Sequence, residues 1–186
     1  MPADREALRS ALKRTASALK AEGVPFALAG SYALWAHGAP ESENDVDFVV
    51  AEEDTERAAN VLTAAGFDVT RPPEDWLFKV GCEGAQVDVL HRVVGEPVDG
   101  AMLERSEEMD LLGIRLPVLP ATDLLSSKLR SMTEHYCDFG RLLPHVRAVR
   151  EQLDWERLRV EVKENDFALA FLFLTCLLYT SPSPRD

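Results

Sequence analysis

The pattern of apolar and polar positions divides the chain into an α/β first half and a helical second half. Residues 4–22 place Leu8, Leu12 and Leu19 at helical spacing, and Gly23 then ends the predicted amphipathic helix. Short apolar runs bounded by glycine or polar residues predict strands. We expect these strands at 24–30, 45–51, 67–71, 76–81 and 85–93, with helices between them at 31–38 and 53–65.

The Gly-Glu-Pro sequence at 95–97 marks a boundary, and the periodicity beyond it is helical. We expect helices at 98–109, 121–133, 135–151 and 154–174. The predicted fold class is therefore α+β (α/β), with a catalytic-type domain at 1–95 followed by a helical substrate- or partner-binding subdomain at 96–175.

The last residues, 176–186, differ in composition from the chain before them. Their sequence, CLLYTSPSPRD, resembles a translated sequencing adapter, in which case the natural protein continues differently after about Thr175. The alternative is a disordered Ser/Pro-rich terminus. We base no functional argument on this segment.

Composition and charge narrow the function classes. The chain has 186 residues, of which 46% are hydrophobic and 28% charged, as in ordinary globular proteins, and its formal net charge is −12. General DNA or RNA binding depends on Lys and Arg that neutralise phosphates, so this balance argues against it. A local basic patch stays compatible with the same net charge.

Cysteine usage and hydropathy predict a cytoplasmic protein without a membrane span. The three cysteines form no CxxC pair, which is typical of reduced thiols. The amphipathic N-terminus has no apolar core of a signal peptide. The longest apolar stretch, FALAFLFLTCLLYT, is shorter than the roughly 20 residues that a spanning helix needs.

Two aspartates lie at the start of a predicted buried strand. Asp45 and Asp47 flank Val46, and alternate residues of a strand point to the same face. The polar sequence ESEN precedes the pair, whereas the paired aspartates of haloacid dehalogenases and glycosyltransferases follow their apolar strand. An EF-hand loop would also need a glycine and a distal glutamate at fixed offsets, which are absent here.

A third carboxylate, Asp88, interrupts the apolar run AQVDVL. An unpaired charge is costly to bury, and a position near Asp45 and Asp47 would add repulsion. Mg²⁺ or Mn²⁺ prefer such hard oxygen ligands, and two ions about 4 Å apart can serve an attacking and a leaving oxygen. In the alternative interpretation Asp45 is a turn or cap residue, and Asp88 pairs with Arg92 or Arg115.

Upstream of the pair, Gly30 and Ser31 lie between a predicted strand and a predicted helix. Glycine lets a ligand approach the backbone, and a helix N-terminus offers free N–H groups to phosphate. An ordinary strand-to-helix turn would look the same in isolation. The order of strand, Gly-Ser, helix, glycine, Asp-Val-Asp and a later strand with one Asp is the more informative feature.

This order resembles the nucleotidyltransferase family of the DNA polymerase β superfamily, whose minimal pattern is hG[GS], then DxD, then a third Asp on a strand. The matching residues are Gly30, Ser31, Asp45, Asp47 and Asp88. The segment 116–143 is similar to the helical part of these proteins, where a Lys on one helix, here Lys128, and an Asp that opens the next, here Asp138, commonly recur.

The resemblance implies a mixed β-sheet with flanking helices and transfer of a nucleoside monophosphate from an NTP to a hydroxyl. It also implies two Mg²⁺ (or Mn²⁺) ions held by the three aspartates, and phosphates held by Gly30, Ser31 and Lys128. The acceptor stays open between a small molecule, a protein and a tRNA end. The acidic composition favours a small molecule or a protein.

The chain departs from the family pattern before the Asp pair. Many relatives carry an Arg and a Ser or Thr there, whereas this chain has Glu41 and Glu43. Lys128, Arg130, Arg141 and Arg147 would then have to meet the phosphate charge, although Arg141 and Arg147 are also typical of a solvated helix face. The rival hypothesis is a degenerate member that binds a nucleotide or a partner protein without turnover, as in a toxin–antitoxin pair.

Overall fold

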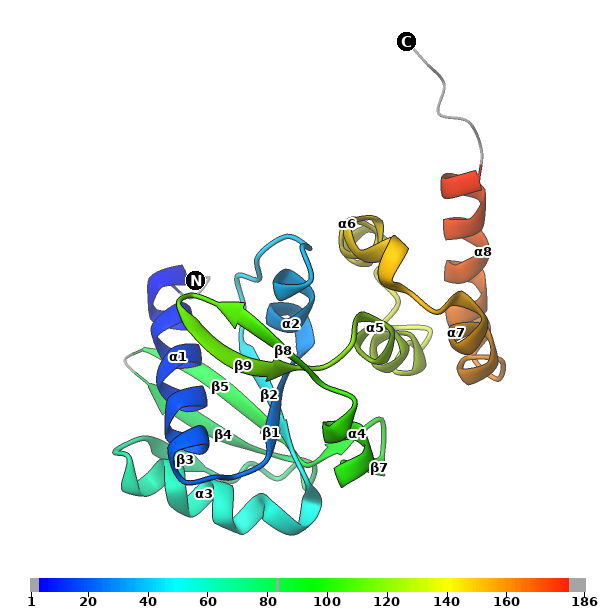
Figure 1. Ribbon diagram of the computed structural model, residues 1–186. Coiled ribbons are helices and arrows are strands. Elements are labelled where there is room, and N and C mark those ends of the chain that lie inside the picture. The colour runs from blue at the N-terminus through cyan, green and yellow to red at the C-terminus, as the bar shows by residue number, and fades with distance from the viewer. Residues whose placement is uncertain (1–3, 83, 181–186) are drawn as a thin grey trace.

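The computed structural model describes residues 4–82 and 84–180 and contains a seven-stranded mixed sheet in the order β3-β4-β5-β2-β1-β9-β8 (Figure 1). The strands are β1 (Phe26–Ala29), β2 (Val46–Val50), β3 (Asp68–Thr70), β4 (Leu77–Cys82), β5 (Ala85–Leu90), β8 (Glu107–Leu111) and β9 (Ile114–Val118). A separate two-stranded sheet pairs β6 (Arg92–Val93) with β7 (Glu96–Pro97). In the main sheet β2 is parallel to β5 and β1 to β9, and all other neighbours are antiparallel. The expected mixed sheet is confirmed.

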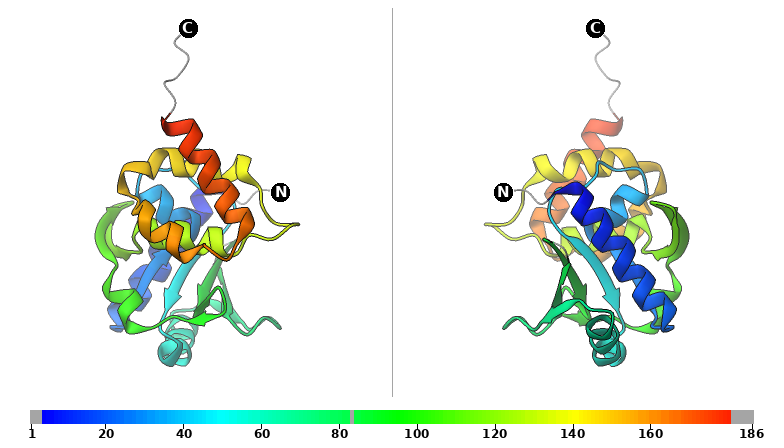
Figure 2. Two further views of the ribbon diagram at one scale, coloured as in Figure 1. Left: turned by 90° about the vertical axis from the view of Figure 1, so that its right-hand side faces the viewer. Right: turned by 90° about the vertical axis from the view of Figure 1, so that its left-hand side faces the viewer.

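The helices are α1 (Arg5–Ala21), α2 (Gly30–Ala36), α3 (Thr55–Ala64), α4 (Gly100–Glu104), α5 (Ala121–Arg130), α6 (Phe139–Val149), α7 (Trp155–Glu161) and α8 (Asp166–Thr180), with 3-10 turns η1 (Glu52–Asp54) and η2 (Arg150–Gln152). Helix α1 packs on β2 and β5 and against α3. Helices α5 to α8 lie together on the side of the molecule away from α1 (Figures 1 and 2). Helix α2 contacts β1 and β2 as well as α5 and α6. It therefore connects the sheet with the helical half.

Helix α1 illustrates how the apolar periodicity positions an element. Asp4 caps it by accepting a hydrogen bond from the Glu6 N–H, and Gly23 follows its end with a positive φ of 63°. Its apolar residues at helical spacing are buried, among them Leu8, Leu12 and Leu19. The core continues into the sheet, where Phe48, Val87 and Val89 are fully buried.

Two helices expected in the second half are wrong. The segment 98–109 forms only the short α4 before β8 begins at Glu107, because residues 107–118 form a β-hairpin whose two turn residues, Leu112 and Gly113, both have positive φ. The segment 154–174 is two helices, since the Asn165 side chain accepts from the Ala168 N–H and starts α8. The strand predicted at 85–93 is shorter in the structure, because β5 ends at Leu90.

The main sheet thus extends beyond residue 95, through β8 and β9. The division of the chain into a catalytic domain at 1–95 and a helical subdomain at 96–175 stays a prediction. Helix α8 runs to Thr180, so the first residues of the segment 176–186 are helical, and its last six lie outside the described residues. No helix within the described part of the chain has the length and apolarity needed to cross a membrane.

Candidate active site

The register of the central strands brings the three predicted aspartates together. Asp47 on β2 lies directly beside Asp88 on the parallel strand β5, and Asp45 immediately precedes β2. One carboxylate oxygen from each of the three lies within 4.8 Å of the other two. Val46 and Phe48, which alternate with the aspartates, are buried in the core. The expected convergence of the aspartates is therefore confirmed, and their catalytic and metal-binding roles stay predictions.

Gly30 is the residue that makes room for this cluster. It starts α2 directly after Ala29, the residue of β1 that lies opposite Asp47, and has a φ of +61°. A Cβ atom at this position would lie 1.8 Å from Oδ2 and 2.6 Å from Cγ of Asp47. Glycine is required here on two grounds, because side chains both strain this backbone conformation and clash with the carboxylate.

The next residue connects the sheet to the helical half. The Lys128 ammonium on α5 donates a hydrogen bond of 3.3 Å to Ser31 Oγ on α2. Lys128 also acts electrostatically on Asp47, whose pKa it lowers against the stronger effect of burial. The structure thus brings Gly30, Ser31 and Lys128 to the same place as the aspartates, as the sequence predicts.

Asp88 has partners that the sequence analysis missed. The Lys79 ammonium on β4 lies 3.3 Å from both carboxylate oxygens of Asp88, and the Gln86 side-chain N–H donates to Oδ1 at 3.0 Å. The alternative pairing of Asp88 with Arg92 or Arg115 is wrong, because these arginines pair with glutamates elsewhere. The antiparallel pairing of β4 with β5 places Lys79 opposite Asp88.

Asp47 carries the strongest electrostatic signal of the site. Burial, reinforced by the neighbouring carboxylates of Asp45 and Asp88, raises its pKa to about 7 from an ordinary 3.8. Three carboxylates so close together repel one another, and a divalent cation relieves both the burial cost and the repulsion. A set of carboxylate oxygens is also the donor set that Mg²⁺ and Mn²⁺ prefer. The residues present therefore fit the predicted metal.

The glutamates that depart from the family pattern are both paired with α1. The Arg9 guanidinium binds both carboxylate oxygens of Glu41 at 2.8 Å, and Arg5 pairs with Glu43. The hydrogen bond from Arg9 lowers the pKa of Glu41. Arg9 also lies over the Trp35 ring of α2, 5.7 Å from its centroid. The loop before β2 is therefore tied to α1 and its added negative charge is balanced there.

A cleft of about 620 Å³ shares Ser31 and Lys128 with the candidate site, although none of the three aspartates is among its lining residues. Ser31 and Asn44 line it beside the sheet, and Lys128, Arg141 and His145 line it from α5 and α6. Burial lowers the pKa of His145 below its usual range, so its imidazole is neutral at pH 7. The permanent positive charges of the cleft among these residues are Lys128 and Arg141.

The other predicted phosphate ligands are placed differently. Arg130 pairs with Glu96 at 3.1 Å, and Arg147 is exposed on α6 and does not line the cleft. Asp138 caps α6 by accepting from the Arg141 N–H at 3.0 Å. Asp138 is therefore a helix cap at the border of the cleft.

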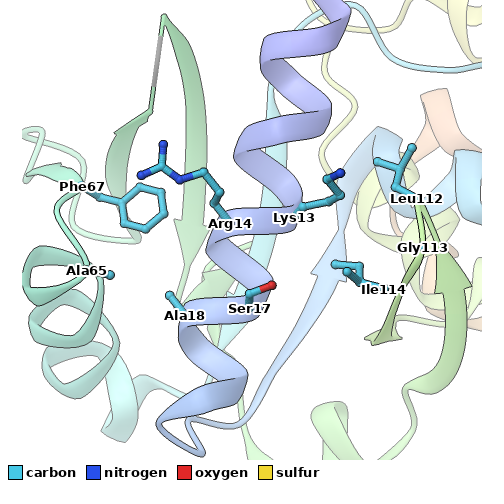
Figure 3. A pocket seen from close by; sticks show the side chains of 9 residues that line it. All are labelled: Lys13, Arg14, Ser17, Ala18, Ala65, Phe67, Leu112, Gly113 and Ile114. Atoms are coloured by element: carbon cyan, nitrogen blue, oxygen red, sulfur yellow. The ribbon is translucent and has the colours of Figure 1, made fainter.

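A second hollow of about 420 Å³ is separate from this cleft (Figure 3). Lys13 and Arg14 of α1 line it together with Phe67 and the turn of the β8–β9 hairpin. The Arg14 guanidinium lies over the Phe67 ring at 5.1 Å from its centroid. Neither the aspartates nor Gly30, Ser31 and Lys128 line this hollow, so it is no part of the candidate active site.

Several solved structures share the fold of this chain. ANT(2″)-Ia in complex with adenylyl-2″-tobramycin superposes with a TM-score of 0.61 at 13% identity, over 89% of this chain and 97% of that one. The lincosamide antibiotic adenylyltransferase LnuA, bound to lincomycin, gives 0.54 at 11%, over 80% and 99%. A putative nucleotidyltransferase from Thermotoga maritima gives 0.53 at 19%, over 87% and 96%.

At these identities the superpositions establish the fold alone. No curated protein sequence matches the chain. A family described as "Uncharacterised nucleotidyltransferase" matches residues 3–180, nearly the whole sequence. The chain therefore belongs to this nucleotidyltransferase family.

Proposed function

We propose that this chain transfers a nucleoside monophosphate from an NTP to a hydroxyl group of a small-molecule acceptor. The observation that carries the proposal is the meeting of Asp45, Asp47 and Asp88 beside the Gly30 backbone. In such a reaction the acceptor oxygen forms a bond to the α-phosphorus, the bond to the pyrophosphate oxygen breaks, and pyrophosphate leaves.

Asp45 and Asp47 would hold the divalent cations, Mg²⁺ or Mn²⁺, with Asp88 completing the site on the acceptor side. When bound, such cations stabilise the negative charge that develops on the phosphate oxygens and make the acceptor hydroxyl easier to deprotonate. Asp88 is the residue that we assign to orienting this hydroxyl and receiving its proton. Lys79 and Gln86 hold the Asp88 carboxylate in place by hydrogen bonds.

The nucleotide phosphates would lie against Gly30 and Ser31. The Asp47 carboxylate fills the space that a side chain at Gly30 would take, so phosphates held here would lie beside the aspartates, and Ser31 Oγ is already oriented by Lys128. The Lys128 ammonium supplies a positive charge from the helical half, on the same cleft as Arg141. Phosphate oxygens would take over the hydrogen bond that Lys128 now gives to Ser31.

The cleft between α2 and α6 would receive the acceptor. Its volume of about 620 Å³ is that of a drug-sized ligand site. Two proteins of the same fold, ANT(2″)-Ia and LnuA, are described with an adenylylated aminoglycoside and a bound lincosamide. These relatives, together with the acidic net charge of the chain, support a small-molecule acceptor over RNA.

The test is transfer of label from an α-³²P-labelled NTP to small molecules of a cell extract, with Mg²⁺ or Mn²⁺. We expect Asp88→Asn to abolish transfer and to keep much of the nucleotide binding, whereas Asp47→Asn should damage both. Asn preserves shape and removes charge, so thermal melting should show both variants folded. Unfolded variants would make the aspartates structural and would refute the proposal.

A second candidate function is binding of a nucleotide or a partner protein without turnover. The Lys79–Asp88 ion pair favours it, because the ammonium occupies both oxygens of the third aspartate. Wild-type protein that binds NTP and yet transfers no label to any extract component, under any divalent metal, would decide for this candidate. A toxin–antitoxin partnership belongs to the same alternative and would require a protein partner.

A further inference from the structure

Lys79 brings a positive charge into contact with the aspartate cluster. It lies on β4, directly across from Asp88 in the antiparallel pair of β4 and β5. Its ammonium is equidistant from the two carboxylate oxygens, at 3.3 Å. The Lys79 side chain is 33% exposed and that of Asp88 only 11%, so the pair is partly shielded from water.

The oxygens of Asp88 are unequally occupied. Oδ1 accepts hydrogen bonds from both Lys79 and Gln86, whereas Oδ2 accepts only from Lys79 among the described residues. The Lys79 ammonium is 3.3 Å from each oxygen, so a divalent cation that binds Asp88 through either oxygen must lie close to this ammonium.

Charge determines what this proximity does. Two positive groups a few ångströms apart repel strongly in the partly shielded environment of a protein surface. Among the described residues, Asp88 is the aspartate of the three that pairs directly with an ammonium, whereas Lys128 contacts Ser31 and acts on Asp47 electrostatically. The acceptor side of the triad is thus less favourable to a cation than the nucleotide side.

We infer that Lys79 is a positioning residue that keeps the acceptor-side cation position closed, so that the nucleotide-free triad holds a single divalent cation. The inference rests on the proposed metal site. The triphosphate of a bound nucleotide would add enough negative charge to admit the second cation. Lys79 thereby links the completion of the site to the arrival of substrate.

The experiment counts Mn²⁺ bound to the nucleotide-free protein by electron paramagnetic resonance titration. We expect one Mn²⁺ for wild type, and for Lys79→Met a second Mn²⁺ that binds at least about tenfold tighter than any second ion of wild type. Lys79→Arg keeps the charge and should behave as wild type. A nonhydrolysable NTP analogue should bring the second Mn²⁺ into wild type.

Gln86→Ala is the matched control, because it removes a hydrogen bond to the same carboxylate without a change of charge. It should leave the Mn²⁺ count unchanged. Lys13→Met removes a lysine charge at the remote hollow of Figure 3 and should also have no effect. Circular dichroism confirms that each variant is folded, and Lys79→Gln replaces Lys79→Met if the latter is not.

The inference is overturned if neutralising Lys79 leaves the number and affinity of bound Mn²⁺ as in wild type, whatever the wild-type value is. It is equally overturned if Gln86→Ala gives the same gain. Failure of the proposed function has a different signature, in which wild type transfers no label from any NTP while the Mn²⁺ binding of the Lys79 variants still changes as expected.

Discussion

Replacing Asp47 by Asn should flatten the pH dependence of stability in the metal-free protein. The folded carboxyl has a pKa of about 7 against an ordinary value of 3.8, so the folded state holds this proton more tightly than the unfolded state. The contribution of Asp47 to stability is therefore complete below pH 3.8 and is lost as the pH rises to about 7.

The shift of about 3 pKa units corresponds to about 4 kcal/mol at 1.36 kcal/mol per unit, as an upper limit for a side chain that water partly reaches. Roughly 2.5 kcal/mol of this should fall between about pH 5 and about pH 8. Asn cannot ionise, so Asp47→Asn should lose that much less stability over the same range. Saturating Mg²⁺ should reduce the difference, since the cation compensates the ionised carboxylate.

The assay is urea unfolding followed by circular dichroism at several pH values, in the presence of a chelator. The free energy of unfolding of wild type is compared with that of Asp47→Asn, which cancels the titration of groups that do not interact with Asp47. Asp110→Asn, on the exposed strand β8, is the control and should follow wild type. Parallel curves for wild type and Asp47→Asn would refute the assignment of the raised pKa to this carboxyl.

Three further predictions concern other parts of the molecule. Gly30→Ala should lower the free energy of unfolding by about 2 kcal/mol or more and abolish transfer, because its Cβ would displace Asp47. Gly66 also has a positive φ but has open space around it, so Gly66→Ala should lower that free energy by only about 1 kcal/mol, as measured by urea unfolding. Asp123→Ala should lower the free energy of unfolding by about 3–5 kcal/mol, because it leaves Arg105 and Arg157 without their buried partner. Urea unfolding measures this loss, with Asp110→Ala at an exposed position as the control. Mg²⁺ with an NTP at about 100 times its dissociation constant should stabilise wild type by about 2.7 kcal/mol, seen as a higher melting temperature, and an unchanged melting temperature with every NTP would contradict nucleotide binding.

The sequence predicts the cluster well because each of its residues leaves a local pattern. Asp45 and Asp47 alternate with buried residues, Asp88 interrupts an apolar strand, and Gly30 separates a strand from a helix. Each pattern depends only on neighbours in the chain. The fold around the cluster follows from the same alternation and from the order of the elements.

The missed features depend on which segments meet in space. The pairing of Arg9 with Glu41 joins α1 to a loop 32 residues away, and no periodicity signals it. The β8–β9 hairpin is missing from the sequence prediction, because its turn residue Leu112 has a positive φ, which is unusual for leucine and gives no sequence signal. The position of Lys79 opposite Asp88 is easier to predict, because Gly84 in the sequence indicates a short turn between the two strands.

The pairing of Asp47 with Asp88 across two adjacent parallel strands also bears on how length can vary among related chains. The chain that connects the two strands runs from Ala51 to Gly84 and includes α3, β3 and β4. The meeting of the aspartates nevertheless depends only on the register of β2 with β5. Residues can be inserted into the connecting loops without separating the carboxylates. A single residue deleted within β2 ahead of Asp47 would instead turn its side chain to the opposite face of the sheet. Spacing within the two strands, and not the distance between the motifs along the chain, is therefore the feature to require when distant relatives are sought.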